Sequence, residues 1–138
     1  MTKTYVLDAC AILAVLSDEP GADVVEEIYE KAASSEAILA MNKLNLLEVY
    51  YYLIREYGRE RADRFYNEVK HLPIHIYKEI TDDVFTEAGQ LKATYKISLA
   101  DSIALAQTIA LDGELLTADH HEFDVIERSE AIRFRWIR

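Results

Sequence analysis

Short apolar runs recur along this chain, and most of them precede longer segments whose apolar residues have helical spacing. The runs that favour strands are residues 5–7, 37–41, 74–77, 114–117 and 132–136. The segments that favour helices are residues 9–16, 22–34, a stretch from Asn42 or Asn45 to 57, 60–71, 81–95 and 98–111. Strands that alternate with helices predict a parallel sheet with helices on both faces. We therefore expect a three-layer α/β/α fold with a mainly parallel sheet of about five strands.

Glycine and proline indicate where several of these segments end. Pro20 and Gly21 separate the first two predicted helices, Gly58 ends the third, and Pro73 follows the fourth. In the last predicted strand, arginines alternate with apolar residues, which is typical of an edge strand.

The composition fits a single domain over residues 1–138. Hydrophobic residues make up 51% of the chain, which is enough for a core, and two prolines and four glycines leave no visible linker. The apolar stretch 5–16 is broken by Asp8, so it is a poor signal peptide and is too short to span a membrane. Cys10 is the only cysteine and cannot form an intrachain disulfide. A cytoplasmic protein is the simplest expectation.

Four carboxylates stand within or beside strongly apolar runs. Asp8 follows the first strand, Glu48 lies inside the third helix, Asp101 precedes an apolar helical run, and Asp119 follows the fourth strand. A buried carboxylate without a partner is costly enough that it protonates or acquires a cation. Ligands of open α/β sheets bind beyond the carboxyl ends of the strands, where Asp8 and Asp119 stand. The four acids together predict one shared metal site.

Each acid also has a simpler explanation. Asp8 is suited to cap the following helix, Asp101 to complete a capping box with the serine three residues before it, and Asp119 to form a turn. Glu48 has the weakest alternative, because a charged residue within an aromatic and aliphatic helix needs a partner. Asn45, three residues earlier, lies on the same helical face as Glu48.

The net charge of −10 argues against a general nucleic-acid coat, since phosphate contacts need lysine and arginine. Two groups of basic residues nevertheless stand out. The first is Arg55, Arg59, Arg61, Arg64 and Lys70, interleaved with acids. The second, near the end of the sequence, is Arg128, Arg133, Arg135 and Arg138. Both groups are consistent with solvated surfaces or with a local track for a phosphate backbone or an acidic partner.

The ordered set of motifs resembles a PIN-domain ribonuclease of the kind found as the toxin in VapBC-type toxin–antitoxin pairs. The matching elements are Val6-Leu7-Asp8, Glu19-Pro20-Gly21-Ala22, Asn45-x-x-Glu48, the run from Leu99 to Ala106 that contains Asp101, and Thr117-Ala118-Asp119 with Phe123. The resemblance covers nearly the whole chain in the expected order. It departs from the family at Cys10, where a small hydroxyl or amide residue is common, and at Glu122, where histidine is common.

The resemblance implies an endoribonuclease in which Asp8, Glu48, Asp101 and Asp119 form the catalytic and metal-binding site. Their hard oxygen ligands favour one or two Mg²⁺ or Mn²⁺ ions over zinc. Asp8, Asp101 and Asp119 would hold metal, and Glu48 would ligate it or orient the attacking water. Glu122 and Asp124 are left without an assigned role.

The resemblance also implies partners: an RNA substrate, a small antitoxin protein and a second copy in a homodimer. From the short apolar stretch described above, we expect no membrane association. A PIN-like module that binds RNA or protein without cutting it is the alternative. A response-regulator receiver domain is disfavoured, because Asp8 stands alone after the first strand and the third strand is followed by Lys78-Glu79.

Overall fold

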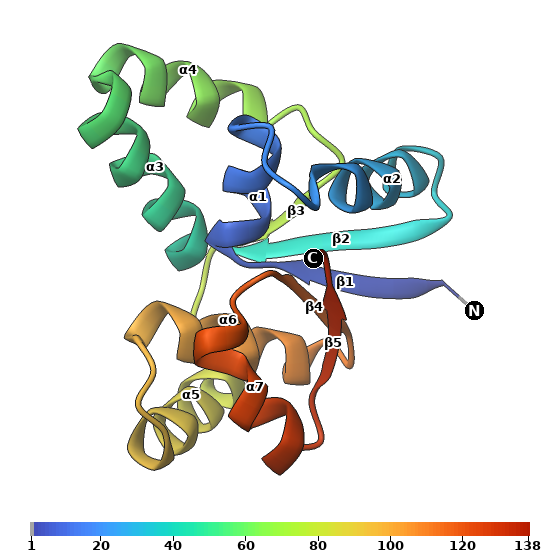
Figure 1. The fold of residues 1–138 in the computed structure, drawn as a ribbon, viewed down its shortest axis with the longest axis vertical. Helices are drawn as coiled ribbons and strands as arrows, with labels where there is room; N and C mark the ends of the chain where they lie inside the picture. The colour runs from blue at the N-terminus through green and yellow to red at the C-terminus, as the bar shows by residue number, and fades with distance from the viewer. Residues whose placement is uncertain (1) are drawn as a thin grey trace.

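The structure, a computed structural model, describes residues 2–138, and there it contains a five-stranded sheet with strand order β3-β2-β1-β4-β5 (Figure 1). The strands are β1 (Lys3–Leu7), β2 (Ala37–Asn42), β3 (His75–Tyr77), β4 (Glu114–Thr117) and β5 (Arg133–Trp136). All of these neighbouring strands pair in parallel. The predicted parallel sheet and the edge position of the arginine-bearing strand are confirmed.

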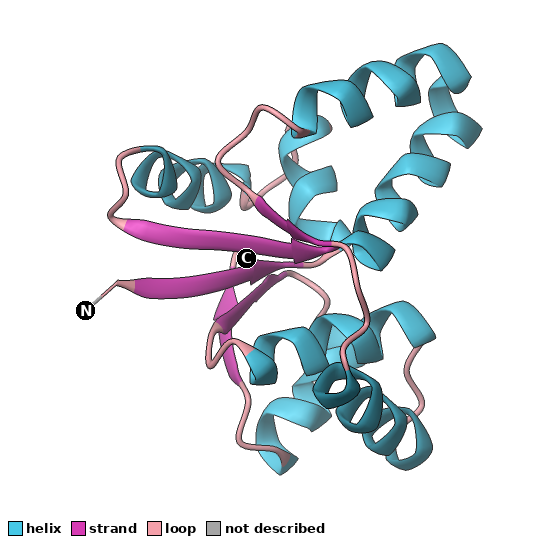
Figure 2. Cartoon of the chain, turned by 180° about the vertical axis from the view of Figure 1, so that it is seen from behind, coloured by secondary structure: helices cyan, strands magenta, loops and turns pink. Residues whose placement is uncertain are grey.

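Helices cover both faces of the sheet, as Figures 1 and 2 show, so the predicted three-layer fold is also confirmed. The helices are α1 (Ala9–Leu16), α2 (Ala22–Ala33), α3 (Lys43–Tyr57), α4 (Arg59–Val69), α5 (Asp82–Thr94), α6 (Leu99–Ala110) and α7 (His120–Ser129). Helices α1 to α4 lie on one side, and α5 to α7 on the other. None of the helices in residues 2–138 is long and apolar enough to cross a bilayer.

The central strand β1 divides its side chains between two hydrophobic cores. Tyr5 and Leu7 pack with α1 to α4, whereas Val6 between them packs with α6 and α7. This division follows from the two-residue period of a strand. Both faces of β1 are therefore apolar, as expected for a strand buried on both sides.

Asn42 joins the two helical layers at the carboxyl edge of the sheet. Its Oδ1 accepts a hydrogen bond from the Leu44 N–H at 2.9 Å, which caps α3. Its Nδ2 donates to Gln107 Oε1 on α6, also at 2.9 Å. Asn42, rather than Asn45, is therefore the N-cap, and Asn45 lies within the helix facing α6.

Helix α7 is the element that the sequence prediction missed. Residues 120–129 contain only two well-buried residues, Phe123 and Ile126, among many polar ones, so the periodic signal is short. Asp119 caps this helix instead of forming a simple turn. The other predicted boundaries differ by one or two residues from the observed ones, within the usual variation at frayed ends.

Candidate active site

The four predicted acids line one pocket of about 330 Å³ at the carboxyl edge of the sheet. They come from four places in the chain: Asp8 after β1, Glu48 on α3, Asp101 on α6 and Asp119 after β4. The other lining residues are Ala9, Cys10, Leu13, Ser17, Glu19 and Tyr52. Among the lining residues that the structure describes there are five carboxylates and no lysine, arginine or histidine. The pocket is therefore strongly acidic and has no internal counter-charge.

Asp8 is both a helix cap and the most deeply buried acid of the pocket. Only 3% of the residue is exposed, and its Oδ1 accepts a hydrogen bond from the Ala11 N–H at 2.9 Å. Burial raises the pKa of Asp8 to about 7, and the negative charges of Asp101 and Asp119 add to the effect. Hydrogen bonds from the Thr117 hydroxyl and the Ala11 N–H act in the opposite direction without cancelling it.

Asp101 lies in the first turn of α6, where the Ser98 hydroxyl accepts a hydrogen bond from its backbone N–H at 3.0 Å. Burial raises the pKa of the Asp101 carboxyl to about 6. The charges of Asp119, Glu48 and Glu122 raise it further, although Ser98 opposes the shift. The negative charges of three other acids therefore act on the Asp101 carboxyl, which lies among the acids of this group.

Glu48 and Asn45 project from one face of α3, as their spacing predicts, and Tyr52 follows on the same face. Burial raises the pKa of Glu48, and the Asn45 amide opposes this shift. The Asn45 Nδ2 donates to the Ala100 carbonyl oxygen at 2.9 Å, which ties α3 to the start of α6. Its Oδ1 is the one buried side-chain polar atom in residues 2–138 that lacks a hydrogen-bond partner. An orphaned acceptor on the residue that contacts Glu48 is consistent with a cationic ligand nearby.

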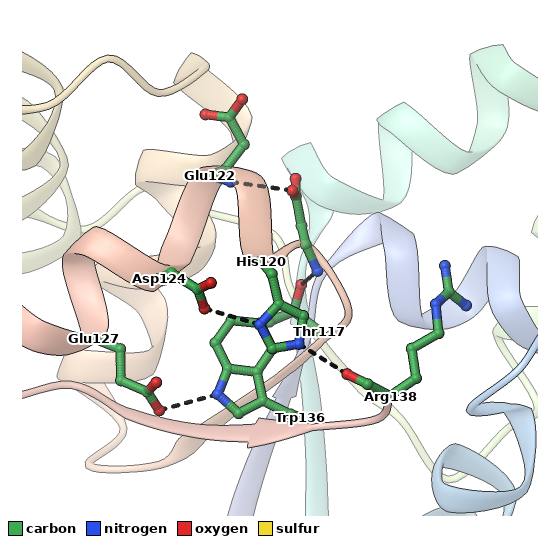
Figure 3. A network of polar contacts seen from close by, with 8 residues as sticks. Thr117, His120, Glu122, Asp124, Glu127, Trp136 and Arg138 are labelled. Carbon is green, nitrogen blue, oxygen red and sulfur yellow. Dashed lines mark hydrogen bonds and ion pairs between the residues drawn. The ribbon is translucent and has the colours of Figure 1, made fainter.

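Asp119 is held by the turn between β4 and α7. Its Oδ1 accepts a hydrogen bond from the Glu122 N–H at 3.2 Å, and its own N–H donates to Thr117 Oγ1 at 3.1 Å (Figure 3). Thr117 is fully buried, and its hydroxyl also bonds Asp8. A single hydroxyl thus couples the two aspartates that follow β1 and β4. The sequence alone indicates no role for Thr117, because only the pairing of β1 with β4 brings it beside Asp8.

A family model described as PIN domain matches residues 5–128. The chain belongs to the PIN domain family. No curated protein sequence matches the chain. Among solved structures, it is similar to a chain of VapBC2 from Rickettsia felis bound to a DNA fragment from their promoter. That match has 15% identity, covers 96% of this chain and 98% of the other, and has a TM-score of 0.74.

Two further solved structures share the PIN fold. DNA-bound VapBC from Salmonella typhimurium matches with 17% identity over 100% of both chains and a TM-score of 0.71. VapC20 from Mycobacterium tuberculosis, described as a sarcin-ricin loop cleaving toxin, matches with 12% identity. That match covers 82% of this chain and 86% of the other, with a TM-score of 0.62. The fold of this PIN domain is therefore the one seen in VapBC toxin structures.

Two further acids of α7 lie in different surroundings. The negative charge of Glu122 acts on Asp101, which places Glu122 beside the acidic group of the PIN domain. Asp124 instead bonds His120 Nδ1 at 2.8 Å, on the side of the helix that faces Trp136 (Figure 3). Glu122 is thus one of the three acids whose charges act on Asp101, whereas Asp124 belongs to a separate network.

The donor set of the pocket fits a hard divalent cation. Carboxylate and amide oxygens are the ligands that Mg²⁺ and Mn²⁺ prefer. Within residues 2–138, no three Asp, Glu, His or Cys side chains converge tightly enough to form a ready-made metal site. Like-charged carboxylates repel one another, so at least one side chain would have to rotate inward to share a cation.

Cys10 lines the pocket but is a poor ligand near neutral pH. Burial raises the pKa of its thiol, and the charge of Asp8 raises it further. Because the thiolate is the form that binds metal, a raised pKa keeps Cys10 neutral.

Proposed function

We propose that this PIN domain is a metal-dependent endoribonuclease and the toxin of a toxin–antitoxin pair. PIN domains of the VapC type are ribonucleases. The observation that carries the proposal for this chain is the gathering of Asp8, Glu48, Asp101 and Asp119 in one pocket without a counter-charge. Desolvated acids with raised pKa values, gathered in a cleft, are typical of functional sites.

In this proposal Asp8, Asp101 and Asp119 hold one or two Mg²⁺ or Mn²⁺ ions. When bound, a divalent ion stabilises negative charge on the scissile phosphate and makes a water molecule more acidic. Asp8 is well suited to such a role because Ala11 and Thr117 fix its carboxylate. The Thr117 hydroxyl transmits the same positional constraint to Asp119 through the Asp119 N–H.

Glu48 orients and deprotonates the attacking water in this mechanism. Burial already favours its protonated form, so the carboxylate is a stronger base than an exposed glutamate. Asn45 lies one helical turn away and is anchored to Ala100. The proton from water is taken up at a Glu48 carboxylate oxygen as the water oxygen bonds the phosphorus. The bond from phosphorus to the leaving ribose oxygen breaks, and that oxygen takes a proton from solvent.

The partner of the proposed toxin is a small antitoxin, and the toxin itself forms a homodimer. VapBC complexes share its fold. A second cavity of about 370 Å³ lies between α3 and α4, away from the acids, and offers an apolar surface. It is lined by Lys43, Leu46, Leu47, Tyr50, Arg59, Asp63 and Tyr66. On α3, Tyr51 is also 41% exposed and adds an aromatic side chain to the surface of this helix. A monomeric mass measured by light scattering at micromolar concentration would refute the proposed homodimer.

Cleavage of a labelled RNA pool tests the nuclease directly. Purified wild-type protein is compared with Asp8→Asn in Mg²⁺, in Mn²⁺ and in EDTA. Asparagine is also a good N-cap, so this change removes the charge while preserving the start of α1. We expect metal-dependent cleavage that Asp8→Asn abolishes and that the distant variant Asp63→Asn retains. Absence of both cleavage and metal binding in folded protein would favour the non-catalytic module instead.

A further inference from the structure

The segment after β5 packs tightly against the turn between α1 and α2. Gly21 in this turn has φ +98°, and an added Cβ would lie 2.7 Å from the Ile137 carbonyl oxygen and 2.9 Å from Ile137 Cγ1. The Ile137 N–H donates to the Thr117 carbonyl oxygen at 3.1 Å. Glycine is therefore needed at position 21 both for its backbone conformation and for this close approach. The contact fixes residues 137–138 between the turn and the end of β4.

Arg138 is anchored at both its backbone and its side chain. Its carbonyl oxygen lies 2.9 Å from His120 Nε2, and the His120 ring stacks on Trp136 with 3.8 Å between centroids (Figure 3). Its Nη1 donates to the Pro20 carbonyl oxygen at 2.6 Å and lies 3.7 Å from Glu19 Oε1. Figure 3 shows the side chain extended away from His120. The guanidinium is thereby held in one place beside the turn.

That place is the rim of the acidic pocket. Glu19, the ion-pair partner of Arg138, lines the pocket, and so does Cys10. The positive charge of Arg138 lowers the pKa of the Cys10 thiol, against the larger effect of burial. The Arg138 side chain is 38% exposed, and among residues 2–138 its hydrogen bonds engage only Nη1. Nε and Nη2 therefore keep donors available to a ligand at the rim.

We propose that Arg138 binds a phosphate of the RNA strand adjacent to the scissile phosphate. This inference rests on the proposed nuclease function. A pocket with five carboxylates repels a polyanion, and no lysine or arginine lies among its lining residues to offset the repulsion. A guanidinium with free N–H groups in a fixed position is well matched to a phosphate. Arg138 thus contributes substrate binding at the edge of a site whose interior is reserved for cations.

The alternative is that Arg138 only fastens the end of β5 to the turn. The two roles differ in the salt dependence of RNA binding. For single-stranded nucleic acid, each phosphate contact contributes about 0.7 to the slope of log Kd against log salt concentration. A purely structural tie contributes nothing to that slope, although its loss would lower thermal stability.

The test is fluorescence anisotropy with a fluorescein-labelled, random-sequence 20-nucleotide single-stranded RNA (a length of about 20 is ample for a single site). The protein carries Asp8→Asn so that the probe stays intact in Mg²⁺. Adding Arg138→Gln is expected to weaken binding about tenfold and to lower the salt slope by about 0.7. Arg138→Lys should retain the slope with intermediate affinity, because it keeps the charge but not the planar fork.

Arg133→Gln is the matched control. Arg133 lies on β5, just before the segment that carries Arg138. Its Nη2 donates to the Asp112 carbonyl oxygen at 2.6 Å and to Asp112 Oδ1 at 3.0 Å, and Asp112 does not line the acidic pocket. Arg133→Gln should leave affinity and slope unchanged. Unchanged affinity and slope in folded Arg138→Gln, or no RNA binding before this change, would overturn the inference. If Arg138→Gln does not fold, the comparison of Arg138→Lys with wild type decides, since an affinity equal to wild type would also overturn it.

Cleavage assays separate this inference from the nuclease proposal. In the protein with Asp8 restored, Arg138→Gln should raise KM about tenfold with little change in kcat, because the contact is made before and during the reaction. Cleavage that is independent of Arg138 would refute the proposed phosphate contact but not the proposed nuclease activity. RNA binding that depends on Arg138, without any cleavage by the wild-type protein, would refute only the proposed nuclease activity.

Discussion

Asp63 on α4 and Asp101 on α6 are both helical carboxylates, yet their surroundings act in opposite directions. Asp63 Oδ1 accepts hydrogen bonds from the Tyr50 hydroxyl at 2.5 Å and from Arg59 Nε at 3.1 Å, and these bonds lower its pKa. Within residues 2–138 Asp101 has no cationic partner, and burial together with the charge of Asp119 raises its pKa to about 6. The same chemical group is thus paired in one region and left unpaired in the other.

The difference shows which acids the fold stabilises in their charged form and which it does not. Asp63 ties α3 to α4 through a satisfied network, so neutralising it would remove interactions. Neutralising Asp8 or Asp101 would relieve desolvation and mutual repulsion. Folding alone gives no reason to gather such groups in one pocket. A positively charged ligand would give one, because it offsets their mutual repulsion.

The largest effect is expected for substitutions of the acidic pocket. Glu48→Gln and Asp101→Asn should each lower the rate of RNA cleavage by about 10²-fold or more, because each removes a proton acceptor or a metal ligand. Single-turnover cleavage of a labelled RNA in Mg²⁺ measures this loss. Asp63→Asn is the matched control, and its cleavage rate should equal that of wild type. Cleavage at the wild-type rate by Glu48→Gln would remove the proposed mechanism.

The arrangement of the sheet was predictable because each strand carries a local signal. Strands such as β1 and β4 each contain a short apolar run, residues 5–7 and 115–116, and their parallel pairing follows from the helices between them. Helix α7 was missed because only Phe123 and Ile126 mark its buried face, and their neighbours are polar. Its stability depends on the Asp119 cap, which is a local contact, and on the packing of Phe123 against Phe134, which is a tertiary contact.

The acids of the site were predictable for a similar reason, since charge within an apolar run is visible in the sequence. The residues that hold these acids in position, however, could not be predicted from the sequence. Thr117 reaches Asp8 only because β4 lies beside β1 in the sheet. Arg138 reaches the pocket rim only because Ile137 packs against Gly21. Such contacts join residues more than a hundred positions apart, and no local pattern encodes them.

The second-largest expected effect is on the free energy of unfolding of the protein without divalent metal. Because the pKa of Asp8 is raised from 3.8 to about 7, the folded state binds its proton more tightly than the unfolded state. Its stabilising contribution is full below about pH 4 and is lost as the pH rises through 7. Asp8→Asn stays neutral throughout, so at pH 8 it should be more stable than wild type, on the order of 2–4 kcal/mol. Urea unfolding in EDTA at pH 5 and pH 8 measures this difference.

Asp63→Asn sharpens this comparison because its pH dependence has the opposite sign. The pKa of Asp63 is lowered, so its contribution is present above the unfolded pKa and is lost as the pH falls. The variant should therefore lose stability at pH 8 and approach wild type at acidic pH. A pocket variant and a paired-acid variant with the same pH trend would contradict the distinction between the two regions.

A smaller effect is expected for Thr117→Val, which keeps the branched shape but removes the hydroxyl. Without that hydrogen bond the pKa of Asp8 should rise further, and the Asp119 N–H should lose its acceptor. The acidic limb of the pH–rate profile of cleavage should therefore move to higher pH, with cleavage near pH 6 reduced by about tenfold. Thr108→Val is the control, because its buried hydroxyl donates to the Ala104 carbonyl oxygen within α6, away from the acidic pocket. An unmoved profile would show that Thr117 does not tune Asp8.

The smallest effect is expected for Cys10→Ser, although Cys10 lines the same pocket as the acids. Burial and the charge of Asp8 raise the pKa of the thiol, so at neutral pH both cysteine and serine are uncharged there. Exchanging one neutral group for another leaves the charge of the pocket unchanged. Cleavage and Mn²⁺ affinity should therefore stay within about twofold of wild type. A loss close to that of Asp101→Asn would mean that position 10 takes part in holding the cation, and that proximity to Asp8 matters more than charge.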